Sequence, residues 1–222
     1  GEAMLRFCFL LPFFCFAGSW SEERLSQMSL EEKVGQLFVA PAAPLREDGH
    51  WPDWQDLLQK YHIGNALLKA SDPASQIRFL EKLQSSSPVP LLILADAEWG
   101  LGMRMSRAIS FPKNLTLGAI QDLSLLEKMG RSIGRQAKKV GIHLNLAPVA
   151  DVNNNPLNPI IHMRSFGEDP LETAKRVQAM IRGMRSEGLF TCVKHFPGHG
   201  DTFQDSHETL PLVQSVELLP FQ

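Results

Sequence analysis

The sequence predicts an α/β protein with a parallel sheet, of the eight-stranded (β/α) barrel class. Short apolar segments alternate with longer segments of helical periodicity, which is the pattern of successive strand-helix units. Residues 91–95 are apolar on both faces, as expected for a strand in a parallel sheet that is covered on both sides. Polar residues follow the ends of the last three predicted strands, and a barrel carries its chemistry at that end.

Each element has its own local signal in the sequence. Helices are expected where a capping residue precedes an apolar periodic segment and a glycine closes it. The expected helices begin at the capping box at Ser29, span residues 54–62, run from Asp72-Pro73 to about residue 84, extend from Asp122 to Gly141, and extend from Asp169-Pro170 to Gly188. The expected strands are residues 35–40, 65–68, 91–95, 142–147 and 189–193.

The last two helices are expected to pack through one apolar face each. In both, apolar residues recur at helical spacing along one side. The predicted faces are Leu126, Met129, Ile133, Ala137 and Val140 in the first helix, and Leu171, Ala174, Val177, Ile181 and Met184 in the second.

About five strand-helix units can be counted, whereas a closed barrel needs eight. The barrel is therefore expected to be truncated, with no linker or repeat interrupting it. The alternative is a doubly wound sheet, which usually carries a glycine-rich phosphate loop after its first strand. Residues 40–44 read Ala-Pro-Ala-Ala-Pro, so the barrel is favoured.

The composition is that of an ordinary globular protein. Of the 222 residues, 44% are hydrophobic and 21% are charged. The formal net charge of -2 and the pI of about 6.4 give no basic footprint for nucleic acid.

The N-terminus has the features of a signal peptide over residues 1–19, with a domain over residues 20–222. Arg6 precedes an apolar run from Phe7 to Ala17, and Gly18-Ser19 is a small-residue exit. The run is too short to span a membrane, so no stable span is expected after removal of the signal. A buried N-terminal helix is the alternative. We expect export to the periplasm or the extracellular space, and a mature chain whose single cysteine, Cys192, is buried in a strand.

Titratable residues are concentrated in residues 194–211, directly after the last predicted strand. Asp205 and His207 are two residues apart, so in extended backbone their side chains can point the same way. A carboxylate beside an imidazole fixes its tautomer, as an acid/base catalyst needs. The first alternative is a metal site built from residues of ligand type, namely His195, His199, Asp201 and His207. Against it, Pro197-Gly198 prevents the helical presentation of a His-x-x-x-His pair. The second alternative is ordinary solvated side chains.

This stretch resembles the signature of glycoside hydrolase family 3. Residues 194–202 read Lys-His-Phe-Pro-Gly-His-Gly-Asp-Thr, and Asp-Ser-His follows at residues 205–207. The sequence is most similar to the β-N-acetylhexosaminidase branch, the NagZ-like enzymes. In that branch an Asp-x-His pair replaces the usual carboxylic acid, which implies His207 as general acid/base and Asp205 as its partner.

The resemblance extends from about residue 28 to residue 220 and implies a set of sugar-binding residues. Residues 96–100, Asp-Ala-Glu-Trp-Gly, resemble the strand-three motif, although Ala97 and Trp99 depart from the Asp-Gln-Glu-Gly-Gly of many relatives. Asp151 is interpreted as structural, bracing the loop that carries Arg164. The implied substrate-binding residues are Asp96, Arg104, Arg164, Lys194 and His195.

The implied function is hydrolysis of terminal non-reducing β-N-acetylglucosamine from glycans such as peptidoglycan fragments, by a retaining mechanism. The substrate is a carbohydrate, and no metal or organic cofactor is implied. The alternatives are a family 3 β-glucosidase, an N-acetylglucosaminide phosphorylase with the same dyad, and a GlcNAc-binding protein without turnover.

A retaining mechanism also needs a second carboxylate. In this family it is an aspartate on a later strand loop, which is expected beyond residue 222. The resemblance gives that role to none of Asp96, Asp151 and Asp201. The 222-residue chain by itself is therefore expected to be inactive on an aryl-GlcNAc substrate, and its open sheet edges are expected to make it prone to aggregation.

Overall fold

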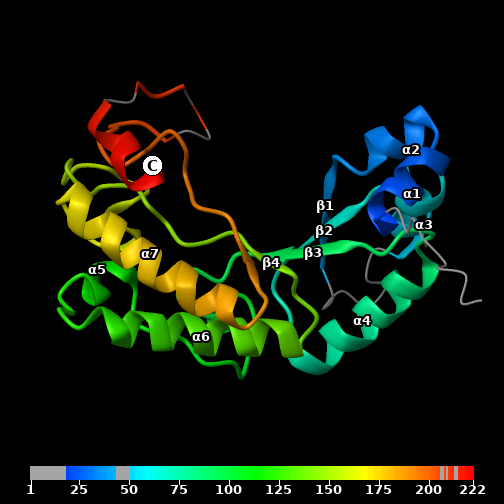
Figure 1. Cartoon of the computed structure of the whole chain (residues 1–222), viewed down its shortest axis with the longest axis horizontal. Coiled ribbons are helices and arrows are strands. Elements are labelled where there is room, and N and C mark those ends of the chain that lie inside the picture. Colours follow the sequence, from blue (N-terminus) through cyan, green and yellow to red (C-terminus); the bar gives the residue numbers. More distant parts are fainter. Residues whose placement is uncertain (1–18, 44–50, 206–207, 209, 213–214) are drawn as a thin grey trace, which may run out of the picture.

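The computed structural model describes residues 19–43, 51–205, 208, 210–212 and 215–222. They form an α/β structure around one five-stranded parallel sheet (Figure 1). Each strand pairs in parallel with the next strand along the chain, so the order is β1-β2-β3-β4-β5. The strands are β1 Val39–Ala42, β2 Asn65–Leu68, β3 Leu92–Ala95, β4 Leu144–Asn145 and β5 Phe190–Thr191.

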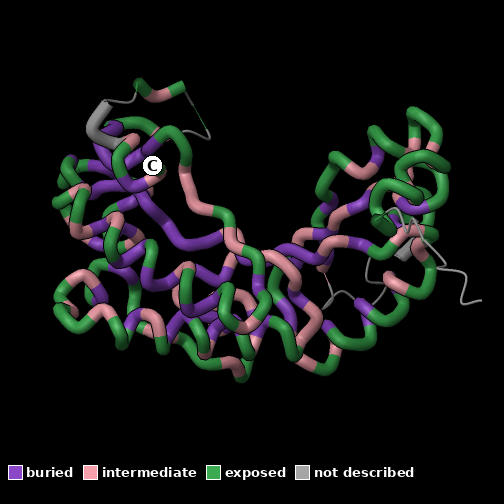
Figure 2. The backbone as a smooth tube through the Cα atoms, in the orientation of Figure 1, coloured by how far each residue is buried: buried purple, intermediate pink, exposed green. Residues whose placement is uncertain are grey.

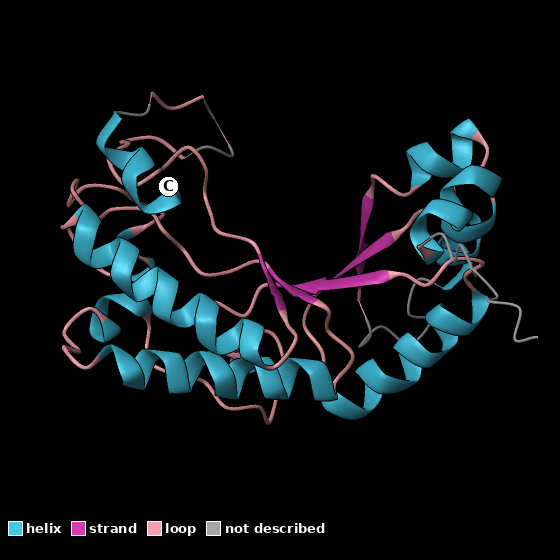
Figure 3. Cartoon of the chain, in the orientation of Figure 1, coloured by secondary structure: helices cyan, strands magenta, loops and turns pink. Residues whose placement is uncertain are grey.

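The strand order distinguishes between the two predicted architectures. A doubly wound sheet reverses its direction of growth, and the reversal creates its binding crevice. Here the sheet grows in one direction through all five strands, and the long helices α4, α6 and α7 line the outer edge of a crescent (Figure 3). Sequential parallel strands with helices outside them are the construction of a (β/α)8 barrel. The predicted fold class is confirmed, with five of the barrel strands in the described residues.

Four of the helices begin where the sequence predicted a cap, whereas the helix predicted over residues 54–62 spans Trp51–Gln59. Ser29 and Glu32 form the expected capping box, and the side chains of Asp72, Asp122 and Asp169 accept backbone N–H bonds at the starts of three further helices. The α-helices are α1 Trp20–Gln27, α2 Leu30–Gly35, α3 Trp51–Gln59, α4 Pro73–Ser86, α5 Asn114–Leu117, α6 Leu123–Lys139 and α7 Pro170–Ser186. Short 3-10 helices are η1 Leu101–Met103, η2 His162–Arg164 and η3 Ser215–Phe221.

Helices α6 and α7 pack side by side. The buried residues lie at the contact between these two helices and along the strands (Figure 2). Four of the five residues of the predicted α6 face are buried, and Val140, directly after the helix, is partly buried against the core. The predicted face of α7 is only partly correct, because Leu171 is 48% exposed while Met180 and Gly183 are buried. The reason is steric: a Cβ on Gly183 would lie 2.1 Å from the carbonyl oxygen of Glu127, so the helices meet along small residues that a search for large apolar side chains overlooks.

Strand β2 has the predicted bounds, the other four strands are shorter than predicted, and the last one is more exposed. The first strand begins at Val39 rather than residue 35, because the backbone N–H groups of Leu37 and Phe38 still donate to carbonyl groups of α2. In β5, Phe190 is 64% exposed, and Cys192 is also exposed. The prediction of a buried Cys192 was wrong, because β5 lies at an edge of the described sheet. The predicted tendency to aggregate depends on these exposed sheet edges, and it stays a prediction.

The predicted signal peptide lies outside the described residues except for Ser19, which caps α1. Within the described part of the chain, no helix is both long and apolar enough to cross a membrane.

Candidate functional site

Two residues far apart in the sequence meet where β3 and β5 end. Asp96 follows β3 directly, and Lys194 follows β5 by three residues. The Nζ atom of Lys194 lies 2.8 Å from Oδ1 of Asp96, and Nη2 of Arg104 lies 2.9 Å from Oδ2 of the same carboxylate. Both carboxylate oxygens of Asp96 are therefore bonded to a cation. The parallel sheet brings these predicted site residues together at one edge.

Glu98 lies at the centre of the cluster, and the sequence analysis gave it no role. Its carboxylate accepts two bonds from Arg164, with Nη2 at 2.7 Å and Nε at 3.0 Å, and it lies 2.9 Å from Nζ of Lys194. Only 1% of the Glu98 side chain is exposed. A signal was available, because Asp96 and Glu98 both come directly after the carboxyl end of a predicted strand, where a barrel carries its chemistry.

The charges of the cluster are stabilised by one another. Burial raises the pKa of Asp96, but the hydrogen bond and charge of Lys194, with those of Arg104, outweigh it and hold the pKa below its usual value. Burial likewise raises the pKa of Glu98, and Arg164 and Lys194 bring it below the ordinary value. Burial lowers the pKa of Arg164, but Glu98 raises it overall. Both carboxylates are therefore ionised at neutral pH.

His195 is held in one tautomer by two charged neighbours. Its Nδ1 lies 2.6 Å from Oδ2 of Asp151, and its Nε2 lies 3.2 Å from Nη2 of Arg164. Because a guanidinium only donates hydrogen bonds, Nε2 must be the acceptor and the ring proton is on Nδ1. The Nδ1–H of His195 thus donates to the carboxylate of Asp151.

Asp151 braces the loop that follows β5, which differs in part from its predicted role. Oδ1 of its fully buried carboxylate accepts the backbone N–H groups of His195, at 3.2 Å, and His199, at 2.9 Å. Its link to the Arg164 loop is a main-chain one, in which Oγ of Ser165 donates to the Asp151 carbonyl. The side-chain role is thus on the loop after β5, and Arg164 pairs with Glu98.

The structure describes only part of the predicted acid/base pair. Asp205 is half-buried, whereas His207 lies outside the described residues. The roles of Asp205 and His207 therefore stay predictions. Before them, residues 198–202 are buried, while Phe203 is 72% exposed, so the buried segment ends at Thr202.

In the metal alternative, the two described histidines, His195 and His199, each contact another side chain through Nδ1. The rings of His195 and His199 meet edge to face with centroids 6.3 Å apart, and Nδ1 of His199 lies 2.6 Å from Oγ1 of Thr202. Among the residues that the structure describes, no three His, Cys, Asp or Glu side chains are grouped as a metal ion would need.

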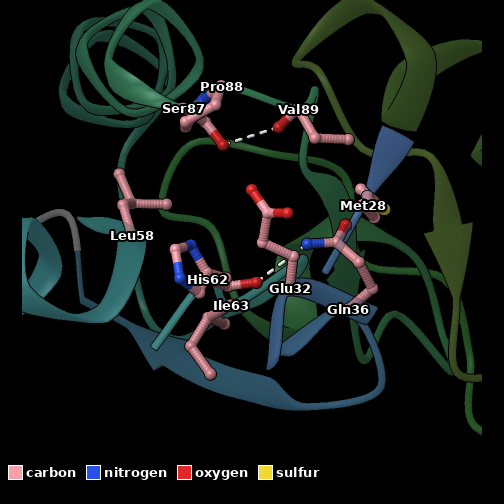
Figure 4. Close-up of a pocket in the computed structure, with 9 residues that line it drawn as sticks. All are labelled: Met28, Glu32, Gln36, Leu58, His62, Ile63, Ser87, Pro88 and Val89. Carbon is pink, nitrogen blue, oxygen red and sulfur yellow. Dashed lines mark hydrogen bonds between the residues drawn. The ribbon is translucent and has the colours of Figure 1, made fainter. Parts of the chain in front are cut away.

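A small cavity of about 20 Å³ lies elsewhere, between α2, α3 and the loop after α4 (Figure 4). The Glu32 carboxylate stands between Ser87 and His62 there, and it accepts the backbone N–H of Ser29 at 2.7 Å as part of the capping box. A cavity of this size holds about one water molecule. None of the predicted site residues lines it.

Comparison with known proteins identifies several relatives. The family profile described as "Glycosyl hydrolase family 3 N terminal domain" matches residues 29–222. The chain is 36% identical to beta-hexosaminidase A of Pseudoalteromonas piscicida over an alignment of 190 residues that covers 77% of this chain and 32% of the relative.

Solved structures share the same fold. A family 3 β-N-acetylglucosaminidase from Paenibacillus sp. has a TM-score of 0.79 at 35% identity, with 87% of this chain and 39% of that one covered. The beta-glucoside phosphorylase BglX has a TM-score of 0.78 at 29% identity, with 85% and 34% covered. The chain spans about a third to about half the length of the first curated relatives it matches.

Proposed function

Because the chain belongs to glycosyl hydrolase family 3, we propose that the full-length protein hydrolyses terminal non-reducing β-N-acetylglucosamine residues with retention of configuration. The observation that carries the proposal is the convergence of Asp96 and Arg164 on Lys194 and His195, the first two residues of the motif at 194–202, beyond the ends of the strands. Arg104 supports Asp96 from the side.

The cluster is suited to holding a sugar in one orientation. A pyranose presents hydroxyl groups, each of which can donate one hydrogen bond and accept others. Ionised side chains bind such groups more strongly than neutral ones do, and here Asp96 accepts while Lys194 and Arg164 donate. Because their side chains are already fixed by ion pairs, little ordering is needed when the sugar binds.

The proposed reaction has two steps. His207, oriented by Asp205, protonates the exocyclic oxygen as the glycosidic bond breaks, and a carboxylate on the opposite side of the ring forms the glycosyl-enzyme intermediate. His207 then removes a proton from water, which attacks the anomeric carbon and releases GlcNAc. Asp96 and Asp151 are not proposed as the nucleophile, because Asp96 is bonded to two cations and Asp151 is fully buried against His195.

The relatives support the substrate class. Two relatives, at 36% and 32% identity, are named beta-hexosaminidase, and the Paenibacillus structure is named a β-N-acetylglucosaminidase. Peptidoglycan fragments are the proposed natural source of GlcNAc, and export to the periplasm or the extracellular space is the proposed location. A β-glucosidase is the alternative within the family, and one relative is named for both activities.

A phosphorylase is the second candidate, favoured by the similarity to BglX. Transfer to phosphate would need cationic groups that are free to bind a second anion. In the described cluster, Arg104, Arg164 and Lys194 are each bonded to a carboxylate. The balance of charge among the described residues therefore favours water as the acceptor.

The test is turnover of an aryl β-GlcNAc glycoside by the full-length protein, with and without phosphate. We expect GlcNAc to be released whether or not phosphate is present. NMR should show that the β-anomer is the first product formed. Formation of GlcNAc-1-phosphate would instead identify a phosphorylase. Faster turnover of the matching aryl β-glucoside would identify a β-glucosidase, and binding without turnover would identify a non-catalytic protein.

A variant connects the activity to the cluster. Asp96→Asn removes a charged acceptor and is expected to lower kcat/KM by about 10- to 100-fold, as loss of a hydrogen bond to a charged group does. Asp122→Asn is the control, because Asp122 caps α6 and asparagine caps a helix equally well. Equal activity of the two variants would place the sugar elsewhere.

A further inference from the structure

We infer that Asn158, assisted by Asn155, is a positioning residue that fixes the root of the acid/base loop to the loop that carries Arg164. The inference rests on the proposed function for its catalytic consequence. Asn158 is 3% exposed and Asn155 is 7% exposed, and both lie between β4 and η2. Neither side chain is assigned to the sugar or to proton transfer above.

Asn158 uses both ends of its amide, each on a different loop. Its Nδ2 donates to the backbone carbonyls of His199 at 2.6 Å and Thr202 at 3.0 Å, with Gly200 at 3.4 Å, and to Oγ1 of Thr202 at 3.2 Å. Its Oδ1 accepts the backbone N–H groups of Ile160 at 2.9 Å and Ile161 at 2.7 Å. These two residues directly precede η2, which contains Arg164. One side chain thus ties both loops together.

Asn155, three residues earlier in the same loop, repeats this arrangement. Its Nδ2 donates to the carbonyls of Thr202 at 2.9 Å and Asp201 at 3.3 Å, while its Oδ1 accepts the N–H of Leu157 at 3.0 Å. The two amides therefore bond all four carbonyls of residues 199–202. These carbonyls belong to buried backbone, which needs partners to remain away from water.

The fit between the loops leaves no room for adjustment at Gly200. A Cβ atom at this position would lie 1.7 Å from the carbonyl oxygen of Val152, so the two backbones are in direct contact. Thr202 is 2% exposed, and the next residue, Phe203, is 72% exposed. The bonded segment thus ends three residues before Asp205 and five before His207, and it sets where the acid/base segment starts.

The bonds that Asn158 makes affect how the acid/base imidazole is positioned relative to the sugar. Proton transfer needs the imidazole within hydrogen-bond reach of the leaving oxygen, and small misplacements of reacting groups lower rates steeply. If residues 199–202 shift, His207 moves relative to a sugar held by Arg164. Asn158→Asp tests this, because it keeps the Oδ1 acceptor for Ile160 and Ile161 but replaces the N–H donors by a carboxylate that faces carbonyl oxygens.

The first readout is turnover by the full-length protein on two GlcNAc glycosides, one with a good aryl leaving group and one with a poor alkyl leaving group. Asn158→Asp is expected to lower kcat about 100-fold on the alkyl substrate and less than about 10-fold on the aryl substrate, with little change in KM. Asn155→Asp, which breaks fewer bonds, should show the same pattern more weakly. Asn154→Asp is the matched control, because Asn154 is exposed in the same loop and gains the same charge.

The second readout does not depend on activity. Amide hydrogen exchange of residues 198–202 should be faster by about tenfold or more in Asn158→Asp, since buried hydrogen bonds are lost, and unchanged in Asn154→Asp. If the wild type hydrolyses no GlcNAc glycoside, the proposed function fails, and the exchange result alone decides the role of Asn158. Equal rate losses on both substrates, a change in KM alone, or unchanged exchange would overturn the inference.

Discussion

Replacing His207 by alanine in the full-length protein is expected to lower turnover of GlcNAc glycosides by about 10²- to 10⁴-fold, the usual range for removal of a general acid/base. Leaving groups of low basicity need little protonation, so the loss should shrink for aryl glycosides that carry them. Asp205→Asn should act in the same direction but more mildly, because it changes the orientation and basicity of the imidazole and not its presence.

Gln204→Ala is the matched control for this change, because Gln204 is exposed in the same loop and carries no titratable group. Its activity should equal that of the wild type on every substrate. Equal losses for good and poor leaving groups in His207→Ala would show that His207 does not transfer the proton.

Replacing Glu98 by glutamine is expected to destabilise the protein and to disable the sugar site together. The amide has nearly the same shape, but it places an N–H group against Arg164 or Lys194 and leaves their charges without their shared carboxylate. Breaking a buried ion pair by changing one partner costs about 3–5 kcal/mol of the free energy of unfolding. Displacement of Arg164 and Lys194 should also lower kcat/KM by about 100-fold.

Glu127→Gln is the matched control, because Glu127 also pairs with two cations, Arg131 and Arg182, but on the surface. Surface pairs contribute about 0–1 kcal/mol, so chemical denaturation should detect little change. An equally small loss of stability in Glu98→Gln would show that the cluster does not depend on Glu98.

The stability difference caused by Glu98→Gln should also depend on pH. The folded-state pKa of Glu98 lies below the unfolded value, so its contribution is present above the unfolded pKa, about 4.3, and is lost as the pH falls through the folded pKa. The difference in unfolding free energy between the wild type and Glu98→Gln should therefore shrink in acid.

The elements and much of the site could be predicted from local sequence because their causes are local. Caps such as Asp72 and Asp169 are recognisable from a few neighbouring residues, and the alternation of strands and helices indicates a parallel sheet. Parallel strands bring their carboxyl ends to one edge, so Asp96 and Lys194 could be placed together although 98 residues separate them.

The features that were missed depend on contacts between distant segments. Glu98 follows a strand like many structural acids, and only the folded chain shows that Arg164 and Lys194 converge on it. Asn158 is one of several asparagines in a loop, and the carbonyl groups that its Nδ2 contacts lie more than 40 residues away. The exposure of Cys192 follows from the position of β5 at a sheet edge, which a single strand does not indicate.

The most direct test of the proposed sugar site is a crystal structure of the full-length protein with GlcNAc. We expect the sugar hydroxyls within hydrogen-bond distance of Asp96, Lys194 and Arg164, with Glu98 still paired to both cations. Binding of GlcNAc at another surface, with the ion pairs of Asp96 and Glu98 untouched, would contradict the assignment of this cluster as the glycan-binding site.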